Sequence, residues 1–224
     1  MRKIIRIMHR DERGITGLET AIILIAFVVV ASVFAYTVLS AGIFSSQKAK
    51  EAIYSGLDEA TSSMVPRGGV TAYAGMVGTT ETAVKVSFTV TTALPGHAVD
   101  LTPPYTASDT DLAASGMQNI CLVSYIDENQ LILDAAWTVD FIGKNNGDYL
   151  LDADEQAVIT VWLANYAASS YATGTDETDP FIDAEADMLK VYDTFMIEVR
   201  GAKGTVLCME RTVTGRFDIV MNLN

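Results

Sequence analysis

Between Glu19 and Lys48 the chain runs for 28 residues without a charged side chain. The centre of this run is residues 21–44, AIILIAFVVVASVFAYTVLSAGIF. At about 1.5 Å per residue, a helix over this segment is roughly 36 Å long, enough to cross the hydrocarbon core of a bilayer. We therefore expect the chain to enter or pass through a membrane.

The residues before this run are basic. Residues 1–14, MRKIIRIMHRDERG, contain five Lys or Arg and two acids. Such an excess holds the N-terminus on the cytoplasmic side and places everything after residue 44 outside. Three interpretations fit: a single-pass anchor, a secretory signal cleaved near residues 40–42, and a leader cut before the apolar stretch. The secretory signal is disfavoured, because its apolar region would be about twice the usual length of roughly 7–15 residues.

The dipeptide Arg13-Gly14 stands just before the apolar stretch, and Ile15, Gly17 and Glu19 follow it. This arrangement resembles the processing site of archaellins, the archaeal flagellins, which share their N-terminal design with type IV pilins. Residues 203–224, KGTVLCMERTVTGRFDIVMNLN, are similar to archaellin C-termini. The resemblance implies cleavage between Gly14 and Ile15. It also implies three parts: a leader (1–14), a long helix (15–66) that spans the membrane before assembly and forms the filament core afterwards, and an outer β-domain (67–224).

The same resemblance implies a function. The chain would polymerise into the archaellum, the swimming filament of archaea, with copies of itself or related subunits as partners. A leader peptidase and an ATP-driven membrane platform would act on a precursor in the cytoplasmic membrane with its N-terminus inside. Two other functions stay open: a subunit of an adhesive or conjugative pilus, and a single-pass membrane-anchored binding module. An anchor would still begin at Met1, which distinguishes it from both filament subunits.

Several side chains of the apolar helix are candidates for contacts between subunits. Small residues recur four apart, at Gly17 and Ala21 and again at Ala31 and Ala35, which lets helices approach closely. Phe27 and Phe34 lie seven apart and would pack as knobs on another face.

Glu19 has two interpretations, because an acid at the edge of an apolar helix needs a partner or water. By resemblance to type IV pilins, Glu19 would face the amine of Ile15 in another chain. Alternatively, it lies in the first turn of the mature helix, where a negative charge suits the helix dipole.

The charge of the chain excludes some partners. The formal net charge is −13, with 15 Lys or Arg and 28 Asp or Glu. Removing five bases and two acids with the leader leaves 10 bases and 26 acids, a net charge of −16. Nucleic acid and anionic lipid surfaces both require a basic face, so neither is expected as a stable partner. Packing such subunits into one fibre implies self-repulsion, and we expect filament stability to depend on salt or divalent cations.

After residue 69 the apolar pattern changes to a period of two. In residues 84–94, Val84, Val86, Phe88 and Val90 alternate with polar side chains, which predicts a strand with one buried face. Similar runs follow at 119–126, 136–142, 157–163, 194–200, 205–213 and 217–223. Between the second and third of these runs, Asn146-Gly147 predicts a hairpin turn, and the acid-rich residues 165–187 read as a solvated loop. The predicted fold class is α+β: a long hydrophobic N-terminal helix followed by an Ig-like antiparallel β-sandwich, the fold that the resemblance to archaellins also implies.

The sequence offers little for catalysis or cofactor binding. After cleavage His97 is the one remaining histidine, in a Pro- and Gly-rich loop, and no glycine-rich phosphate loop is present. We expect neither an enzyme nor a cofactor. The acidic residues Asp148, Asp152, Asp154 and Glu155 could supply oxygen ligands to Ca²⁺ but lack EF-hand spacing, so a solvated turn is the preferred interpretation and no metal is expected.

Two cysteines, Cys121 and Cys208, lie in apolar runs. An even count in an exported domain permits one disulfide, and two separate buried thiols fit equally well. No Asn-X-Ser/Thr sequence is present, although archaellins commonly carry N-glycans.

Overall fold

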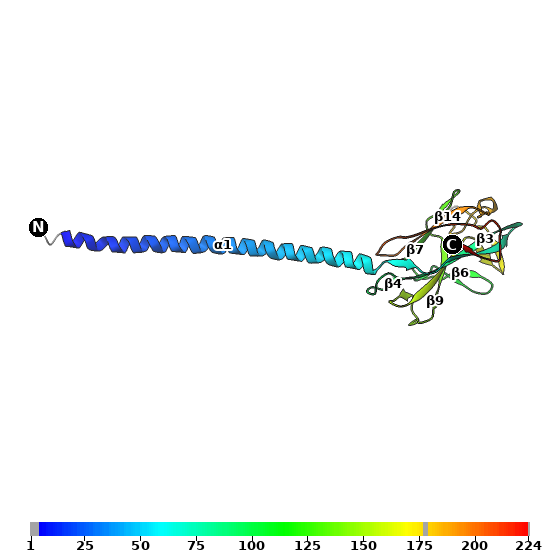
Figure 1. Cartoon of the computed structure of the whole chain (residues 1–224), viewed down its shortest axis with the longest axis horizontal. Helices are drawn as coiled ribbons and strands as arrows, with labels where there is room; N and C mark the ends of the chain where they lie inside the picture. The colour runs from blue at the N-terminus through cyan, green and yellow to red at the C-terminus, as the bar shows by residue number, and fades with distance from the viewer. Residues whose placement is uncertain (1–4, 177–178, 224) are drawn as a thin grey trace. The chain divides into compact units, whose positions relative to one another are not determined.

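The computed structural model describes residues 5–176 and 179–223, with side chains from Thr16 onward. The chain divides into two compact units, Met1–Ser55 and Gly56–Asn224. The first unit is formed by helix α1, whose last residues belong to the second unit. The second unit is rich in β-strands (Figure 1). This architecture confirms the expected fold class.

Helix α1 extends over Ile5–Thr61. It begins inside the expected leader, ten residues before the start expected for the mature helix. It ends earlier than expected, because Met64–Pro66 form strand β1 and pair with β3. Met64 is buried in the core of the β-domain. The chain therefore leaves the helix before Met64 and does not form a further helical turn. The hydroxyls of Thr61 and Ser63 donate to the carbonyls of Leu57 and Glu59, at 2.9 and 2.8 Å.

Two large, mainly antiparallel sheets form the β-domain, here called the head. The larger contains β1, β2 (Val70–Val77), β3 (Thr80–Thr92), β9 (Ala136–Ile142), β11 (Gln156–Trp162), β12 (Asn165–Ala167), β13 (Ser170–Ala172) and β16 (Val220–Leu223). The smaller contains β7 (Leu122–Ile126), β8 (Leu131–Ile132), β14 (Thr194–Arg200) and β15 (Leu207–Thr212). Two further pairs join β4 (Val99–Asp100) with β10 (Leu150–Leu151), and β5 (Tyr105–Ala107) with β6 (Leu112–Ala114); η1 (Glu185–Asp187) is a short 3-10 helix.

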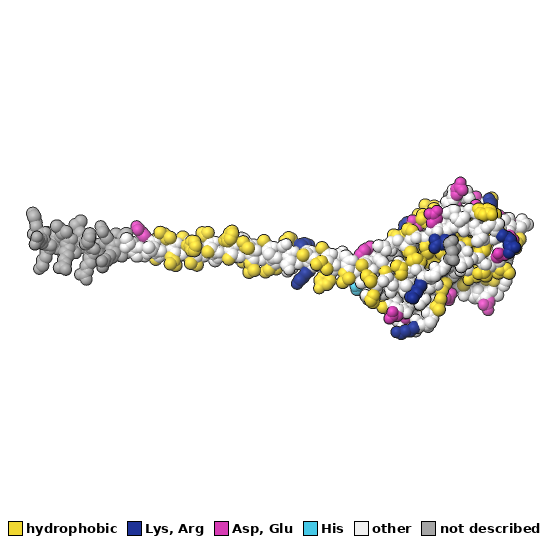
Figure 2. Space-filling model, in the orientation of Figure 1, with side chains coloured by type: hydrophobic (Ala, Val, Ile, Leu, Met, Phe, Trp, Pro, Cys, Tyr) yellow, Lys and Arg dark blue, Asp and Glu magenta, His cyan; other side chains and the backbone are white. Residues whose placement is uncertain are grey.

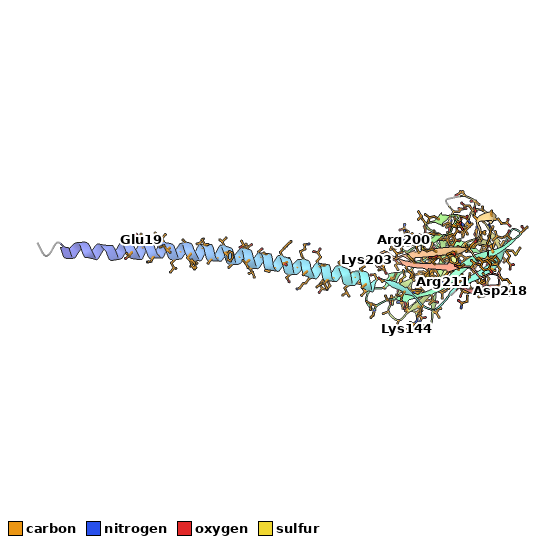
Figure 3. The ribbon with its side chains drawn as sticks, turned by 45° about the horizontal axis from the view of Figure 1, so that its top comes forward. Glu19, Lys144, Arg200, Lys203, Arg211 and Asp218 are labelled. Atoms are coloured by element: carbon orange, nitrogen blue, oxygen red, sulfur yellow. The ribbon has the colours of Figure 1, made fainter. Side chains whose placement is uncertain are left out.

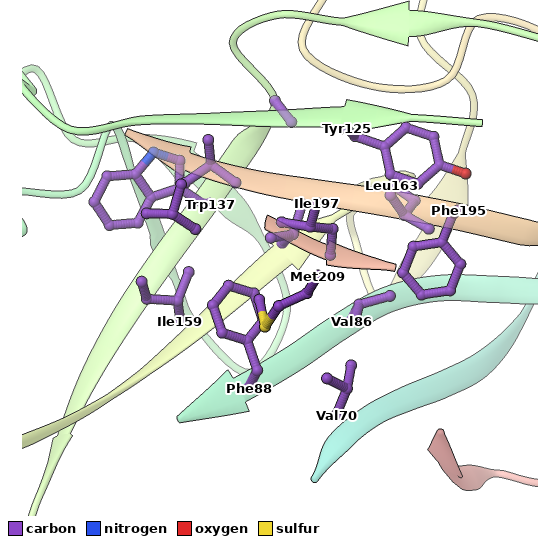
Figure 4. Close-up of a cluster of buried hydrophobic side chains, with 14 of the residues drawn as sticks. Val70, Val86, Phe88, Tyr125, Trp137, Ile159, Leu163, Phe195, Ile197 and Met209 are labelled. Carbon is purple, nitrogen blue, oxygen red and sulfur yellow. The ribbon is translucent and has the colours of Figure 1, made fainter. Parts of the chain in front are cut away.

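The two large sheets pack face to face over one hydrophobic core. All seven strands predicted from the sequence are present, and Val84, Val86, Phe88 and Val90 face inward as expected. Trp137 of β9 faces the same core, joined by Phe195 and Ile197 of β14 (Figure 4). The rings of Tyr125 and Phe195 stack, with their centres 6.1 Å apart.

The other face of the larger sheet carries mainly hydroxyl and short apolar side chains. We call it the hydroxyl face; by strand register it comprises Val65, Thr71, Tyr73, Lys85, Ser87, Thr89, Thr91, Thr138, Asp140, Ile142, Gln156, Val158, Thr160, Trp162, Val220 and Asn222. Ser87 and Thr160 share a hydrogen bond of 2.8 Å across β3 and β11. The Trp162 indole N–H donates to the Thr138 hydroxyl at 3.1 Å. These polar groups are thus satisfied within the face.

One end of the hydroxyl face is covered by a second, aromatic cluster. Leu112, Ala136, Trp162 and Phe181 are buried together there, and Tyr105, Tyr166 and Tyr171 pack against them. Residues 165–187, expected to be a solvated loop, therefore include two short strands and the buried side chains of Phe181 and Ile182. That expectation was wrong, because Phe181 packs in the cluster with Trp162 and Ile182 belongs to the main core.

The turn predicted at Asn146-Gly147 lies between β9 and β11, which pair as an antiparallel hairpin. Gly147 has φ of +93°, a left-handed conformation that glycine adopts at low cost. The loop is long because it also contains β10, which pairs with β4.

Candidate assembly surface

The surface of α1 is exposed around its whole circumference. Every described side chain from Thr16 to Leu57 is exposed, including Phe27 at 73% and Phe34 at 69%. Among the described residues, Thr16–Thr61 is the one helix long and apolar enough to cross a membrane. Figure 2 shows hydrophobic side chains along its length. A helix that is apolar on all sides is stable only in lipid or among other helices.

The small residues predicted to allow close packing lie on this exposed surface. Nothing in the chain lies within 4 Å of the place where a Gly17 side chain would begin. Ala21, Ala31 and Ala35 are equally uncovered. Another helix could therefore approach the backbone at these positions without displacing any part of its own chain.

Three hydroxyl groups in the apolar part of this helix donate to carbonyls of the preceding turn. Thr20 donates to the carbonyl of Thr16 at 2.9 Å, Ser32 to Val29 at 2.8 Å, and Thr37 to Phe34 at 2.8 Å. Bonding to the preceding turn removes the cost of an unpaired hydroxyl in hydrocarbon. These three polar residues are compatible with a lipid surround.

Glu19 is the first acid among the described side chains of the helix (Figure 3). Because α1 begins at Ile5, Glu19 lies in the interior of the helix in the uncut chain and far from its first turn. The dipole interpretation therefore applies only after cleavage. The side chains of Arg13 and Ile15, like the surroundings of Gly14, lie outside the described side chains, so the predicted cut and the proposed Ile15 amine contact stay predictions.

The second half of the helix is more polar. Lys48 and Glu51 form an ion pair of 2.6 Å between exposed side chains. Ile53 and Leu57, four residues apart on one face of the helix, are 68% and 52% exposed. Buried side chains within this chain begin only at Thr61, so these two apolar side chains are available to other molecules.

Within the second unit, Asp58 in the last turn of α1 lies close to His97 and Lys203. Its carboxylate lies 3.1 Å from the His97 ring and 3.8 Å from the Lys203 ammonium. All three side chains are substantially exposed. His97 therefore contacts a carboxylate at the open surface, and this arrangement does not resemble a catalytic dyad, in which the histidine also meets a nucleophile.

The acidic turn differs from the solvated turn that we expected. Glu155 is 4% exposed, and its carboxylate accepts the backbone N–H groups of Asn146 and Asp152, each at 3.2 Å. Asp148 and Asp154 remain exposed. Among the described residues, no group of three or more His, Cys, Asp or Glu side chains is arranged to hold a metal ion. Glu155 organises the turn by accepting backbone hydrogen bonds.

The two cysteines are free thiols. Cys121 is buried just before β7, whereas Cys208 is exposed on β15, with β14 between the two strands. The thiols thus point to opposite sides of the smaller sheet, which the geometry of a disulfide does not allow. Neither sequence interpretation holds in full, since one thiol is buried and the other is not.

A helix uncovered on every side, joined to a head with its own core, defines a subunit that inserts into membranes or assembles with other copies. Comparison with known proteins identifies the family. The sequence model of the archaeal-type flagellin family matches residues 14–211. The chain is 32% identical over 220 residues to probable flagellin 1 of Archaeoglobus fulgidus, covering 96% of each chain. It is 30% identical over 218 residues to probable flagellin 1 of Aeropyrum pernix, covering 91% of this chain and 93% of that one.

The chain therefore belongs to the archaeal-type flagellin family. Among solved structures, the archaeal flagellum of Methanospirillum hungatei strain JF1 is similar, with 24% sequence identity and a TM-score of 0.48. That similarity covers 92% of this chain and 98% of the other.

Proposed function

We propose that this archaeal flagellin is the repeating subunit of an archaellum, and that it reaches the filament after its leader is cut between Gly14 and Ile15. The exposure of the apolar helix on all sides is the observation that supports the proposal. Both core clusters of the head consist of residues from Met64 onward. The side chains of residues 16–57 therefore have no part in either core cluster and are available to contact other molecules.

The leader determines when the helix can leave the membrane. Each Lys or Arg at mid-bilayer costs on the order of 2.5–3.5 kcal/mol, so five of them oppose outward movement of the helix. After cleavage the new amine of Ile15 and the carboxylate of Glu19 are the charges left near that end. Extraction into a growing fibre then becomes feasible. We place the uncut N-terminus in the cytoplasm and the head outside, because the basic residues precede the helix.

Transfer of the helix from lipid to a helix bundle changes its hydrophobic energy little, because acyl chains are as apolar as leucine. Close packing at Gly17, Ala21, Ala31 and Ala35, with knobs at Phe27 and Phe34, would supply part of the stability. Contacts between heads would supply the rest. In the mature chain Glu19 would face the Ile15 amine of a neighbouring copy.

The role is structural and not enzymatic, in keeping with a family of filament proteins. A leader peptidase would make the cut, and an ATP-driven membrane platform would lift the subunit outward. Family membership does not favour a static pilus subunit or a membrane-anchored binding module.

The state of the N-terminus tests this route. Filaments sheared from cells should contain a subunit whose intact mass and N-terminal sequence begin at Ile15. Gly14→Leu should leave the uncut precursor in the membrane, because the residue next to the scissile bond becomes bulky. Gly56→Leu is the matched control: it enlarges another helical glycine with open space around it, and it should be processed normally. Filaments of normal length and number from the Gly14→Leu strain would refute the assignment of the cut.

A further inference from the structure

Among the described residues of the head, the Lys85 ammonium has no acidic partner. Lys85 lies on the hydroxyl face, directly between Tyr73 and Trp162 on the neighbouring strands. Its ammonium is 4.6 Å from the centre of the Trp162 ring and 5.1 Å from that of Tyr73. Among the described side chains, no carboxylate lies within 4.0 Å of it. Burial lowers the pKa of Lys85, and no acid is among the causes of that shift.

The aromatic contacts distinguish Lys85 from other bases of the chain. The mature chain has 26 acids for 10 bases, and the ion pairs among the described residues involve Lys48, Arg200, Lys203 and Arg216. Lys85 is instead flanked by two aromatic rings. Cation–π contacts leave the outer side of the ammonium able to meet an anion.

The hydroxyl face around Lys85 carries almost no charge. Asp140, on the edge strand β9, is its one acid, and Lys85 its one base. The central positions are Ser87, Thr89, Val158 and Thr160, which are short and branched or hydroxylated. Two copies at −16 repel each other over most of their surfaces. They can approach here without bringing like charges together.

The face is also large enough for a specific contact. Strands β2, β3, β9 and β11 each have at least seven residues, and the edge strand β16 has four. At about 4.8 Å between strands and about 3.3 Å per residue, the face spans roughly 24 by 20 Å and is shorter along β16. Both partners together would then bury on the order of 1,000 Å², which is about the lower limit for a specific interface. Ile142 at one edge and Val220 at the other are 50% and 55% exposed, and they would add apolar area.

We propose that the hydroxyl face is the contact between neighbouring heads in the filament, and that a carboxylate of the second copy binds the Lys85 ammonium there. The inference rests on the proposed function, since it requires a filament. The contact is heterologous: the face of one copy meets a different, acidic surface of the next. Contacts of this kind continue from copy to copy, whereas a self-complementary contact closes into a dimer.

Thiol protection tests the contact without disrupting it. Thr89→Cys is made in a Cys208→Ser background, which leaves the buried Cys121 as the other thiol. Maleimide labelling of purified filaments should be at least tenfold slower than labelling of the same subunits dispersed in detergent. Thr212→Cys, on the exposed face of the other sheet, is the matched control and should react at similar rates in both states. Equal rates at Thr89→Cys in both states would overturn the proposal.

Three other outcomes are also decisive. Protection seen on cells but lost in purified filaments identifies a different cell-surface partner, such as a polysaccharide, and overturns the proposal. Equal protection at both thiols means that the whole head is shielded, which also overturns it. Absence of filaments together with an uncut leader counts against the proposed function instead, so the two failures are distinguishable.

The role of Lys85 is tested separately. Lys85→Gln keeps most of the side-chain volume and removes the charge, so its filaments should dissociate at a lower temperature than wild type. Lys190→Gln, at an exposed position elsewhere on the head, should have no effect. Unfolding of detergent-dispersed subunits should be nearly unchanged in both variants. Lys85→Gln filaments as stable as wild type would remove the ion pair from the proposal.

Discussion

The Lys85 ammonium lies 4.6 Å above the Trp162 ring, on a tryptophan that is itself almost fully buried. Trp162 is thus both the floor of a cation site and the centre of the aromatic cluster with Phe181. Removal of its ring should therefore affect the head more than removal of the charge that it supports.

Trp162→Ala should lower the free energy of unfolding of the head by about 3–5 kcal/mol, the usual cost of deleting a large buried ring. Lys85→Met, which keeps the aliphatic stem, should cost no more than about 1 kcal/mol. Denaturant unfolding of detergent-dispersed full-length chains, followed by near-UV circular dichroism, measures both. Similar losses in the two variants would mean that the ring contributes mainly through the cation.

Glu185 should make the head sensitive to acid. Its carboxylate accepts hydrogen bonds from the Thr80 hydroxyl at 2.5 Å and the Thr79 N–H at 3.1 Å, which lower its pKa below 4.5. When folding lowers the pKa of a carboxyl group, that group stabilises the folded state at pH values above its pKa in the unfolded chain. This stabilisation is lost as the pH falls through its pKa in the folded protein. The melting temperature of wild type should therefore be higher than that of Glu185→Gln at pH 7. This difference in melting temperature should shrink as the pH falls below about 4.5. A difference that is independent of pH would contradict this role for Glu185.

The two thiols should react very differently. Burial, with the nearby charge of Asp100, raises the pKa of Cys121 to about 12, so little reactive thiolate forms at neutral pH. Native protein treated with N-ethylmaleimide should gain one adduct, at Cys208, and a second only after denaturation. Intact-mass analysis counts them. A chain that gains no adduct until it is reduced would contain the disulfide that the structure excludes.

Ala31→Leu should weaken the filament while leaving the head and the membrane precursor unchanged. The larger side chain prevents close approach of a second helix, at a cost of about 1–3 kcal/mol for each overpacked contact. Val33→Leu, about 160° away around the helix, is the control because it enlarges a position that is already bulky. Filament yield and dissociation temperature are the measurements. If both variants match wild type, Ala31 does not lie at a tight contact.

The strong periodic patterns in the sequence predicted most of the fold. The alternation of Val84, Val86, Phe88 and Val90 located the central strand, because a two-residue period brings alternate side chains to one buried face only in extended backbone. Strand β2 gave a weaker signal: its residues Ala72, Ala74 and Gly75 are small, and an irregularity after Tyr73 shifts its register. Small side chains blur the contrast on which the pattern depends.

The parts that the sequence did not predict depend on tertiary contacts. The end of α1 moves to Thr61 because pairing of Met64 with Thr92 outweighs another turn of helix. Phe181 belongs to the core although it lies among acids, because Tyr105 and Trp162 surround it after folding. For the helix surface the chemistry was readable in advance, since an uncharged run of this length has few stable environments. The Lys85 site could not be predicted from the sequence, because it is formed with Tyr73 and Trp162 from two other strands.

The uncovered circumference of α1 has a genetic consequence. If every side chain from Thr16 to Leu57 packs against other subunits, one mutant helix disrupts the packing of several wild-type helices around it. A mutant copy expressed beside the normal gene would then interrupt fibres built mostly from sound protein. A mutation that destabilises the head core would instead unfold only the subunit that carries it, and that subunit would not enter the filament. Lesions in the helix should therefore be dominant, and lesions in the head core recessive.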